Sequence, residues 1–325
     1  MTTADTPGAL TVAAAAALPE HLRPTAEAAR QFIRDRHAAA TRRTYASDVL
    51  QFRGWAEARG LAVLPAAPET VALFLTDQAT GGIKAATLTH RLSAIRYLHR
   101  KAGFASPTDA EVVKATFAGI RRVIGTAQRQ VAPATADRVA AMLATCDHSL
   151  QGKRDRALLA LGFGGAFRRS ELVALTVADL TSTDEGIRVM VRRSKTDQEG
   201  AGVVVPVLDG ARLRVKAALA DWMEAAGIIE GPLFVRMSRG DKPRKAALTD
   251  RSVADIIKRR ALLAGLDPAL FSGHSLRAGF VTSGAASGAS LFKIMEVSRH
   301  KKVDTVRGYV RMAEQFKDHA GAAFM

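Results

Sequence analysis

The spacing of apolar residues constrains the fold of this chain most strongly, because it follows the period of a helix along most of the length. Tyr45, Val49 and Phe52 share one stripe within residues 41–59, which end before Gly60, as expected for an amphipathic helix with a glycine stop. Three more helices are predicted, opened by Pro68 and Glu69, capped by Thr87, and capped by Asp109. Residues 25–126 therefore read as an all-helical domain, preceded by a mobile tail at residues 1–24.

A polar segment interrupted by proline follows this helical domain. Residues 127–134 contain Gln128, Gln130 and Pro133, a composition typical of a linker between domains. We expect a second domain at residues 135–325, which begins with helices at 135–143, 154–163 and 168–175.

The period then changes from 3.6 to 2. Ile187, Val189 and Val191 alternate with other residues, and a second apolar run covers residues 203–207, so a hairpin with its loop at 196–202 is predicted. After Gly210 the helical period returns and is expected to continue to the end. The predicted fold class is mainly α, with an all-helical N-terminal domain and a mostly helical second domain that holds a small antiparallel β-sheet.

Charge and composition favour a nucleic-acid partner. The 325 residues contain 47 Lys and Arg against 31 Asp and Glu, a net charge of +16, and phosphates attract such an excess because binding releases their condensed counterions. No membrane is expected as a partner, since no segment approaches the roughly 18 apolar residues of a membrane span. The single cysteine, Cys146, excludes an intrachain disulfide and fits a cytoplasmic protein. The apolar run at residues 10–18 has no basic flank, so no secretion signal is predicted.

The helix capped by Thr87 is rich in basic residues on the faces away from its apolar stripe. Such a surface can lie along DNA and reach phosphates or base edges, although charged helix faces are often only solvated. The candidate DNA-binding residues are Arg91, Arg96, Arg100 and Lys101, with His90 and His99 beside them.

Several common chemistries are missing from the sequence. There is no G-x-x-x-x-G-K-[ST] motif for ATP, no Cys/His spacing for zinc and no H-E-x-x-H, and no acidic cluster that would hold two Mg²⁺ ions. No cofactor and no metal are therefore expected. If the protein cuts DNA, its own side chains must supply the positive charge and the nucleophile.

Attack on a phosphodiester needs cations for the non-bridging oxygens, a nucleophile and a proton for the leaving oxygen, and phosphoryl transfer depends mainly on positioning and electrostatics. In G-A-F-R-R-S-E-L, Arg168 and Glu171 are three residues apart, so the carboxylate can orient the guanidinium; Arg169 is the competing arginine. Lys195 lies at the end of the first strand of the predicted hairpin, beside its loop, from where it can reach into a site and act as a proton donor.

Two further motifs lie near the C-terminus. His274 and Arg277, in H-S-L-R, are one turn apart near the start of a helix, a place that favours phosphate. His300 precedes Tyr309 by nine residues, and the other two tyrosines, Tyr45 and Tyr97, lie in the N-terminal domain. A tyrosine with an ordinary pKa near 10 needs a base or cationic surroundings to attack at neutral pH. Each motif alone is common on protein surfaces, and only their order is informative.

That order, R-x-x-E-L, a hairpin lysine, H-x-x-R, a later His and then Tyr, resembles the tyrosine recombinase (phage integrase) family over residues 30–320. The N-terminal domain resembles that family's core-binding domain. The segments F-S-G-H-S-L-R-A-G-F and L-H-R-K-A-G-F-A-S-P-T-D resemble the Cre recombinase branch.

The resemblance implies a role for each candidate residue. Arg168 and Arg277 would clamp the scissile phosphate, Lys195 would protonate the leaving 5′ oxygen, and His274 would act as the base or positioner for Tyr309. His300 would donate a hydrogen bond to a non-bridging oxygen, Glu171 would support Arg168, and Tyr309 would form a 3′-phosphotyrosine without ATP or metal. The family also implies a clamp on a double-stranded DNA recombination site, a homotetramer and a Holliday-junction intermediate.

Two positions depart from the family pattern. Arg299 stands where the family usually has glycine, which predicts a local difference in the backbone, and His300 follows the common family pattern whereas the Cre branch has tryptophan there. Two alternatives stay open, a type IB-like topoisomerase and a catalytically silent DNA-binding relative. The chain after Tyr309, with Phe316 and residues 321–325, is a candidate for docking on a neighbouring protomer.

Overall fold

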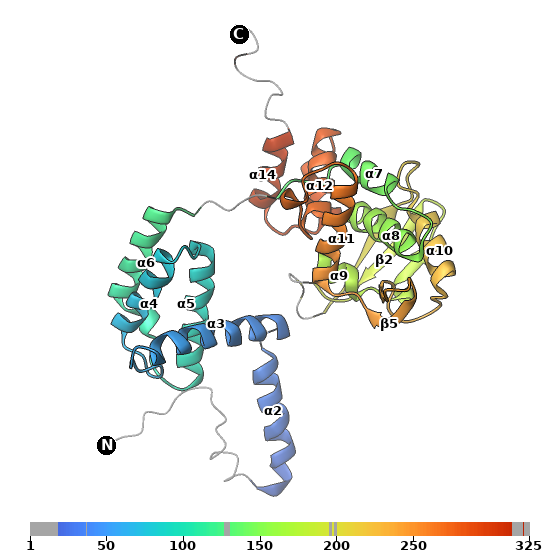
Figure 1. Ribbon diagram of the computed structural model, residues 1–325. Helices are drawn as coiled ribbons and strands as arrows, with labels where there is room; N and C mark the ends of the chain where they lie inside the picture. The colour runs from blue at the N-terminus through green and yellow to red at the C-terminus, as the bar shows by residue number, and fades with distance from the viewer. Residues whose placement is uncertain are drawn as a thin grey trace. The chain divides into compact units, whose positions relative to one another are not determined.

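The computed structural model describes residues 19–36, 38–126, 131–194, 197, 200–313 and 321. The chain divides into two units, residues 1–129 and 130–325, drawn in blue to green and in green to red in Figure 1. The described residues are mostly helical with small antiparallel sheets, which confirms the predicted fold class. None of the described helices is long and apolar enough to cross a membrane.

The first unit is built from helices only. Its core places Phe52, Phe74, Leu75, Leu88 and Ile95 in one fully buried cluster, where α3 packs on α5 and α4 packs on α6. The elements are η1 (Glu20–Leu22), α2 (Arg23–Asp35), α3 (Ala39–Glu57), α4 (Pro68–Thr80), α5 (Ala85–Lys101), η2 (Pro107–Asp109) and α6 (Glu111–Ile124). This is the unit that the 3.6-residue spacing predicts.

Three boundaries in this unit differ from the prediction. Helix α2 begins at Arg23, within the stretch predicted as a tail, whose residues 1–18 lie outside the described part of the chain. Helix α5 begins at Ala85 after Lys84, two residues ahead of the predicted cap Thr87. Asp109 does not cap α6, because it belongs to η2 and Ala110 takes the cap position. Its carboxylate binds two arginines of α5 instead, as described below.

The second unit combines helices with a three-stranded antiparallel sheet of order β1-β2-β3. Ile187, Val189 and Val191 of β2 are buried and alternate with exposed residues, and Val189 pairs with Val205 of β3, as the two-residue period predicts. The elements are α7 (Ala136–Ala144), α8 (Leu150–Gly164), α9 (Arg169–Ala174), η3 (Val177–Asp179), β1 (Leu180–Ser182), β2 (Gly186–Val191), β3 (Val203–Leu208), α10 (Val215–Ala226), β4 (Val235–Met237), β5 (Pro243–Ala247), α11 (Asp250–Leu263), η4 (Pro268–Leu270), α12 (Ser275–Ala286), α13 (Leu291–Ser298) and α14 (Val303–Ala313).

The prediction of helices alone after Gly210 is wrong, because β4 and β5 form a second antiparallel hairpin. The two strands have three and five residues and are exposed along most of their length. A three-residue strand is too short, and a strand exposed along four of its five residues too polar, to show the alternation of apolar and polar residues that a sequence pattern can detect. Strand β1 escaped prediction for the same reason, with three residues of which two are exposed.

Helix α8 lies at the centre of the second unit and leads directly to the candidate site. Ala157, Leu158, Leu159, Ala160 and Leu161 are all completely buried, because α7, α10 and α12 pack around this helix (Figure 1). The second half of α8, residues 157–164, is apolar on every side, which is typical of such a central position. Its C-terminal end therefore positions the following turn, residues 165–168.

Helix α12 is held by an unusually close backbone contact. A side chain at Gly279 would place its Cβ 1.7 Å from the carbonyl oxygen of Ala134, so only glycine lets the segment before α7 lie against this helix. The Ala134 amide also donates to the Ser275 carbonyl at 2.9 Å. These contacts fix the first turns of α12, where two of the predicted site residues lie.

Candidate active site

The turn between α8 and α9 places Arg168 beside Glu171. Arg168 is the N-cap of α9; its amide donates to Glu171 Oε2 at 2.9 Å and its Nη1 donates to Oε1 at 2.5 Å. The carboxylate thus closes a capping box while it orients the guanidinium. The competing Arg169 points elsewhere, since it is 41% exposed and lies 3.3 Å from Asp250. Arg168, and not Arg169, is therefore the arginine that pairs with Glu171.

Helix α12 contributes His274 and Arg277 from one turn. His274 is the exposed N-cap residue, and its amide donates to Ser272 Oγ at 3.1 Å. Arg277 is only 5% exposed, and its Nη1 donates to the carbonyl oxygen of Ala166 at 2.8 Å. Its Nη2 is buried and has no hydrogen-bond partner among the described residues. Burial, and after it the positive charges of Arg168 and Arg299, lower the pKa of Arg277 to about 9.

His300 follows the end of α13. Its Nδ1 lies 2.8 Å from the Oγ of Ser298, which is completely buried. Burial lowers the pKa of His300 to about 4, with further lowering from Arg277, Arg168 and Arg299. The imidazole is therefore neutral at neutral pH and has one N–H to donate.

Arg299, which sequence reasoning treated only as a departure from the family pattern, lies inside the site. Its side chain is 9% exposed, and its Nη2 donates to Glu171 Oε2 at 2.8 Å. Its backbone is left-handed, with φ 57° and ψ 39°, the conformation that favours glycine. The predicted difference from the family backbone stays a prediction, and what the structure describes at this position is an arginine side chain on a backbone that suits glycine. An arginine at a position where the family usually has glycine is the sequence signal that could have identified it.

Glu171 is the negative centre of the site. Burial raises the pKa of this carboxyl, but the charge of Arg299 and the hydrogen bonds from Arg168 outweigh it, so the pKa lies below the ordinary value. One carboxylate therefore faces three guanidinium groups, those of Arg168, Arg277 and Arg299. The site is strongly cationic, as a phosphate-binding site requires.

Tyr309 lies on α14, which packs against α12. It is half-buried beside the cluster of Val281, Ala285, Ile294 and Val306. A negative charge on the Tyr309 phenolate would favour the protonated form of Arg277. The two side chains are therefore close enough to interact electrostatically.

Two expectations fall outside the described residues. Lys195 is one, although the loop around it is partly described: Ser194 and Asp197 form a bridge, and Asp197 accepts amide hydrogen bonds from Gly200, Ala201 and Gly202. The proposed docking segment of the C-terminus is the other, since residues 314–320 and 322–325 are not described.

The expected basic face of α5 needs correction. Arg91 is buried, 9% exposed, and donates to Gln78 Oε1, so its guanidinium is not part of the exposed basic face that was predicted. His99 is fully buried and accepts from the Ala66 amide at 2.9 Å. Helical period alone placed both on an outer face, but the packing of α4 and of the segment around Ala66 covers them.

The remaining basic residues of α5 are exposed at its C-terminal end. Arg96 and Arg100 lie 2.8 Å and 3.4 Å from the carboxylate of Asp109, and Lys101 is exposed beside them. The usable basic surface of this helix is therefore smaller than predicted.

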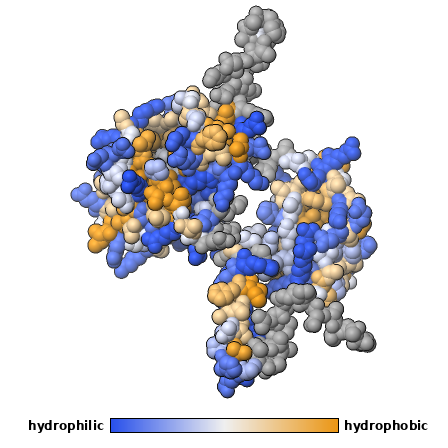
Figure 2. Space-filling view, turned by 180° about the vertical axis from the view of Figure 1, so that it is seen from behind, coloured by the Kyte–Doolittle hydropathy of each residue, from blue (hydrophilic) through white to orange (hydrophobic). Residues whose placement is uncertain are grey.

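A second basic surface was missed, because it lies on the hairpin that the sequence did not predict. The β4–β5 hairpin carries five exposed basic residues within ten positions, Arg236, Arg239, Lys242, Arg244 and Lys245. The density of basic residues is a signal that sequence reasoning could have used. Figure 2 shows how hydrophilic residues dominate the visible face of each unit.

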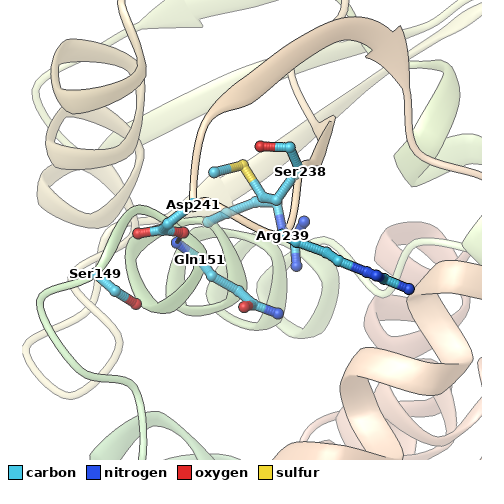
Figure 3. Close-up of a pocket in the computed structure, with 7 residues that line it drawn as sticks. Ser149, Gln151, Ser238, Arg239 and Asp241 are labelled. Atoms are coloured by element: carbon cyan, nitrogen blue, oxygen red, sulfur yellow. Dashed lines mark hydrogen bonds between the residues drawn. The ribbon is translucent and has the colours of Figure 1, made fainter.

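A pocket of about 490 Å³ lies near this hairpin, lined by Ser149, Gln151, Arg154, Met237, Ser238, Arg239 and Asp241 (Figure 3). Asp241 accepts from the amides of Leu150 and Gln151 at the start of α8. The candidate residues lie beyond the opposite end of this helix, so the pocket is separate from them. Among the described residues, no three His, Cys, Asp or Glu side chains are grouped as a metal site requires.

Both units of the chain match known protein families. Residues 134–315 match the phage integrase family, and residues 30–103 match the phage integrase N-terminal SAM-like domain. The chain is 40% identical to an integrase/recombinase xerD homolog of Selenomonas ruminantium, over 86% of this chain and 84% of that protein. It is 26% identical to recombinase cre of Escherichia phage P1, over 79% of each chain. The likeness to Cre noted from the sequence is thus accompanied by a higher identity to a XerD-type protein.

Solved structures share the fold. The XerH recombinase in a post-cleavage complex with difH DNA matches with a TM-score of 0.60 and 19% identity, over 84% of this chain and 76% of that chain. Lambda integrase residues 75–356 bound to DNA match with a TM-score of 0.58 and 21% identity, over 87% of this chain and 92% of that chain. The family match over residues 134–315 and the 40% identical relative show that the chain belongs to the phage integrase family of tyrosine recombinases.

Proposed function

We propose that the protein cleaves and rejoins a double-stranded DNA site through a 3′-phosphotyrosine intermediate formed on Tyr309. The observation that carries this proposal is the buried Nη2 of Arg277, which has no hydrogen-bond partner among the described residues. A buried guanidinium donor left without a partner is costly unless a ligand satisfies it. A phosphate oxygen is the acceptor that suits an arginine fork.

In the proposed reaction, Arg168 and Arg277 bind the non-bridging oxygens of the scissile phosphate. The phenolic oxygen of Tyr309 forms a bond to phosphorus and passes its proton to His274. The bond from phosphorus to the 5′ oxygen breaks, and Lys195 protonates that oxygen. Because the phosphodiester energy stays in the tyrosyl ester, a 5′-hydroxyl of another strand can reverse the step without ATP or metal.

His300 supports the same phosphate as a neutral donor. If the Ser298 hydroxyl donates to Nδ1, the imidazole proton lies on Nε2 and can be given to a non-bridging oxygen. Supporting this role is the low pKa of His300, about 4, since it favours the neutral imidazole at neutral pH.

DNA would be held by basic surfaces on both units. The exposed end of α5, with Arg96, Arg100 and Lys101, and the basic β4–β5 hairpin would contact phosphates. The first unit, within residues 25–126, would act as the core-binding domain, and residues 135–325 as the catalytic domain. By likeness to its relatives, a homotetramer would carry two sites through a Holliday junction in the cytoplasm.

One experiment identifies the DNA sequence that the protein cleaves and tests whether Tyr309 is the nucleophile. Duplexes of random sequence that carry a nick are incubated with the protein, and detergent-stable adducts are isolated and sequenced. The wild type should give an adduct that Tyr309→Phe lacks, while DNA binding by the variant stays within about threefold, because only one hydroxyl is lost. An adduct formed by Tyr309→Phe would contradict the proposal. Plasmid relaxation without strand exchange would indicate a type IB-like topoisomerase, and binding without any adduct a catalytically silent relative.

A further inference from the structure

The Arg299 side chain lies in the candidate site in a strained backbone setting. Its φ of 57° is left-handed, which residues other than glycine adopt only where the surroundings hold them. The holding contacts come from the side chain itself, which is 9% exposed. The contacts of the Arg299 guanidinium therefore stabilise this left-handed conformation.

Those contacts join three segments of the chain. Nη1 donates to the carbonyl oxygens of Gly165 at 3.1 Å and Val297 at 2.8 Å, and Nη2 donates to Ala166 at 3.3 Å and Glu171 at 2.8 Å. The guanidinium also lies 5.1 Å from the ring centre of Phe167. One side chain thus links the turn after α8, helix α9 and the end of α13.

Two of these acceptors are shared with the proposed phosphate clamp. Glu171 receives Arg299 on Oε2 and Arg168 on Oε1. The Ala166 carbonyl receives both Arg299 and Arg277, and Ala166 itself has a left-handed φ of 46°. Arg299 therefore holds the partner of each clamping arginine.

A buried arginine elsewhere in the unit shows what a purely structural ion pair looks like. Arg260 is 6% exposed and lies 2.9 Å from the fully buried Asp155. Its other acceptor is the carbonyl of Thr145, and no residue of the candidate site takes part. Arg299 differs because its partners are those of Arg168 and Arg277.

We propose that Arg299 is a positioning residue for DNA cleavage: it holds the Glu171 carboxylate and the Ala166 carbonyl where they orient Arg168 and Arg277. It also adds a third fixed positive charge around the scissile phosphate, because Glu171 balances only one of the three guanidiniums. This inference rests on the proposed function.

The test uses the full-length chain and the nicked duplex selected above, and measures the single-turnover rate of adduct formation at saturating DNA beside the DNA affinity. Arg299→Met should slow adduct formation about 10–100-fold, as expected for loss of orientation at a reacting centre, while affinity stays within about threefold. Arg299→Gly removes the side chain and relieves the backbone, and should be slowed as much. Arg299→Lys, which keeps the charge and can reach Glu171, should be at least about threefold faster than Arg299→Met.

The matched control is Arg260→Met, the same change at an arginine of similar burial and pairing, and its rate should stay within about threefold of wild type. Two outcomes overturn the inference: wild-type rates in Arg299→Gly, which would mean that only the backbone conformation matters, or equal slowing in Arg260→Met, which would indicate general destabilisation. Failure of the proposed function is distinguishable, because the wild type would then form no adduct that depends on Tyr309.

Discussion

At the scale of single residues, the fold keeps His300 neutral. Burial and three neighbouring arginines lower its pKa from 6.5 to about 4. Around pH 7 this leaves a neutral hydrogen-bond donor beside the charged guanidiniums of Arg168, Arg277 and Arg299. Positive charge on arginines suits phosphoryl transfer, because arginines keep their charge over the physiological pH range.

The same shift predicts how stability depends on pH. Between pH 6.5 and about 4 the unfolded chain protonates His300 and the folded protein does not, so the free energy of unfolding should fall as the pH falls through this window. The shift corresponds to at most about 3 kcal/mol, and to roughly 1–2 kcal/mol after allowance for solvent screening of a partly buried group.

Chemical denaturation of wild type and His300→Gln at several pH values checks this expectation. The variant should lack the His300 contribution, so its free energy of unfolding should fall less steeply between pH 6.5 and 4. An unchanged slope would show that His300 is not the group that titrates.

At the scale of elements, α12 carries His274 and Arg277, and its place depends on Gly279. Any side chain there would collide with the backbone at Ala134, 1.7 Å from the carbonyl oxygen. Backbone cannot move aside as the end of a flexible side chain can. The position of α12, which carries Arg277, is thus fixed by this contact with the segment before α7.

Gly279→Ala should therefore lower the free energy of unfolding by about 1–3 kcal/mol, the usual cost of overpacking, and should slow adduct formation by moving Arg277. Urea unfolding followed by tryptophan fluorescence and the nicked-duplex assay measure the two effects. Gly119→Ala, in the interior of α6 with nothing within 4 Å, is the control. It should raise stability by about 0.5–1 kcal/mol, since alanine is the better helix former; equal loss in both variants would refute the packing argument.

At the scale of the whole molecule, the net charge of +16 is spread over both units, so DNA binding should weaken steeply with salt. A protein that neutralises several phosphates loses about 10³-fold or more in affinity between 50 and 200 mM salt. The basic β4–β5 hairpin offers a local test. Replacing Arg244 and Lys245 together by Gln should make the slope of log affinity against log salt shallower by about two, roughly one per phosphate contact.

Fluorescence anisotropy with the selected duplex measures this slope. Arg212→Gln, which changes an exposed arginine paired with Asp137, is the control and should leave the slope near that of wild type. A double variant with the wild-type slope would exclude the hairpin from the DNA interface.

Local patterns predicted well what depends on local spacing. The helices of the first unit follow from apolar residues three and four apart, and the β2–β3 hairpin follows from the alternation around Val189. The proximity of Arg168 and Glu171 was also predictable, because they are three residues apart. The β4–β5 hairpin was not, since exposed strands carry no such pattern.

The sequence by itself determined the mainly helical fold, the order of the candidate residues and the family to which they belong. Only the tertiary structure decided which basic residues meet in the site. In the fold, Arg91 is buried within the first unit, Arg169 pairs with Asp250, and Arg299 pairs with Glu171. The reason is that charge pairing depends on distances between segments far apart in the chain. Arg299 and Glu171 are 128 residues apart, and Arg277 and Ala166 are 111 apart, so no local spacing records that they share one site.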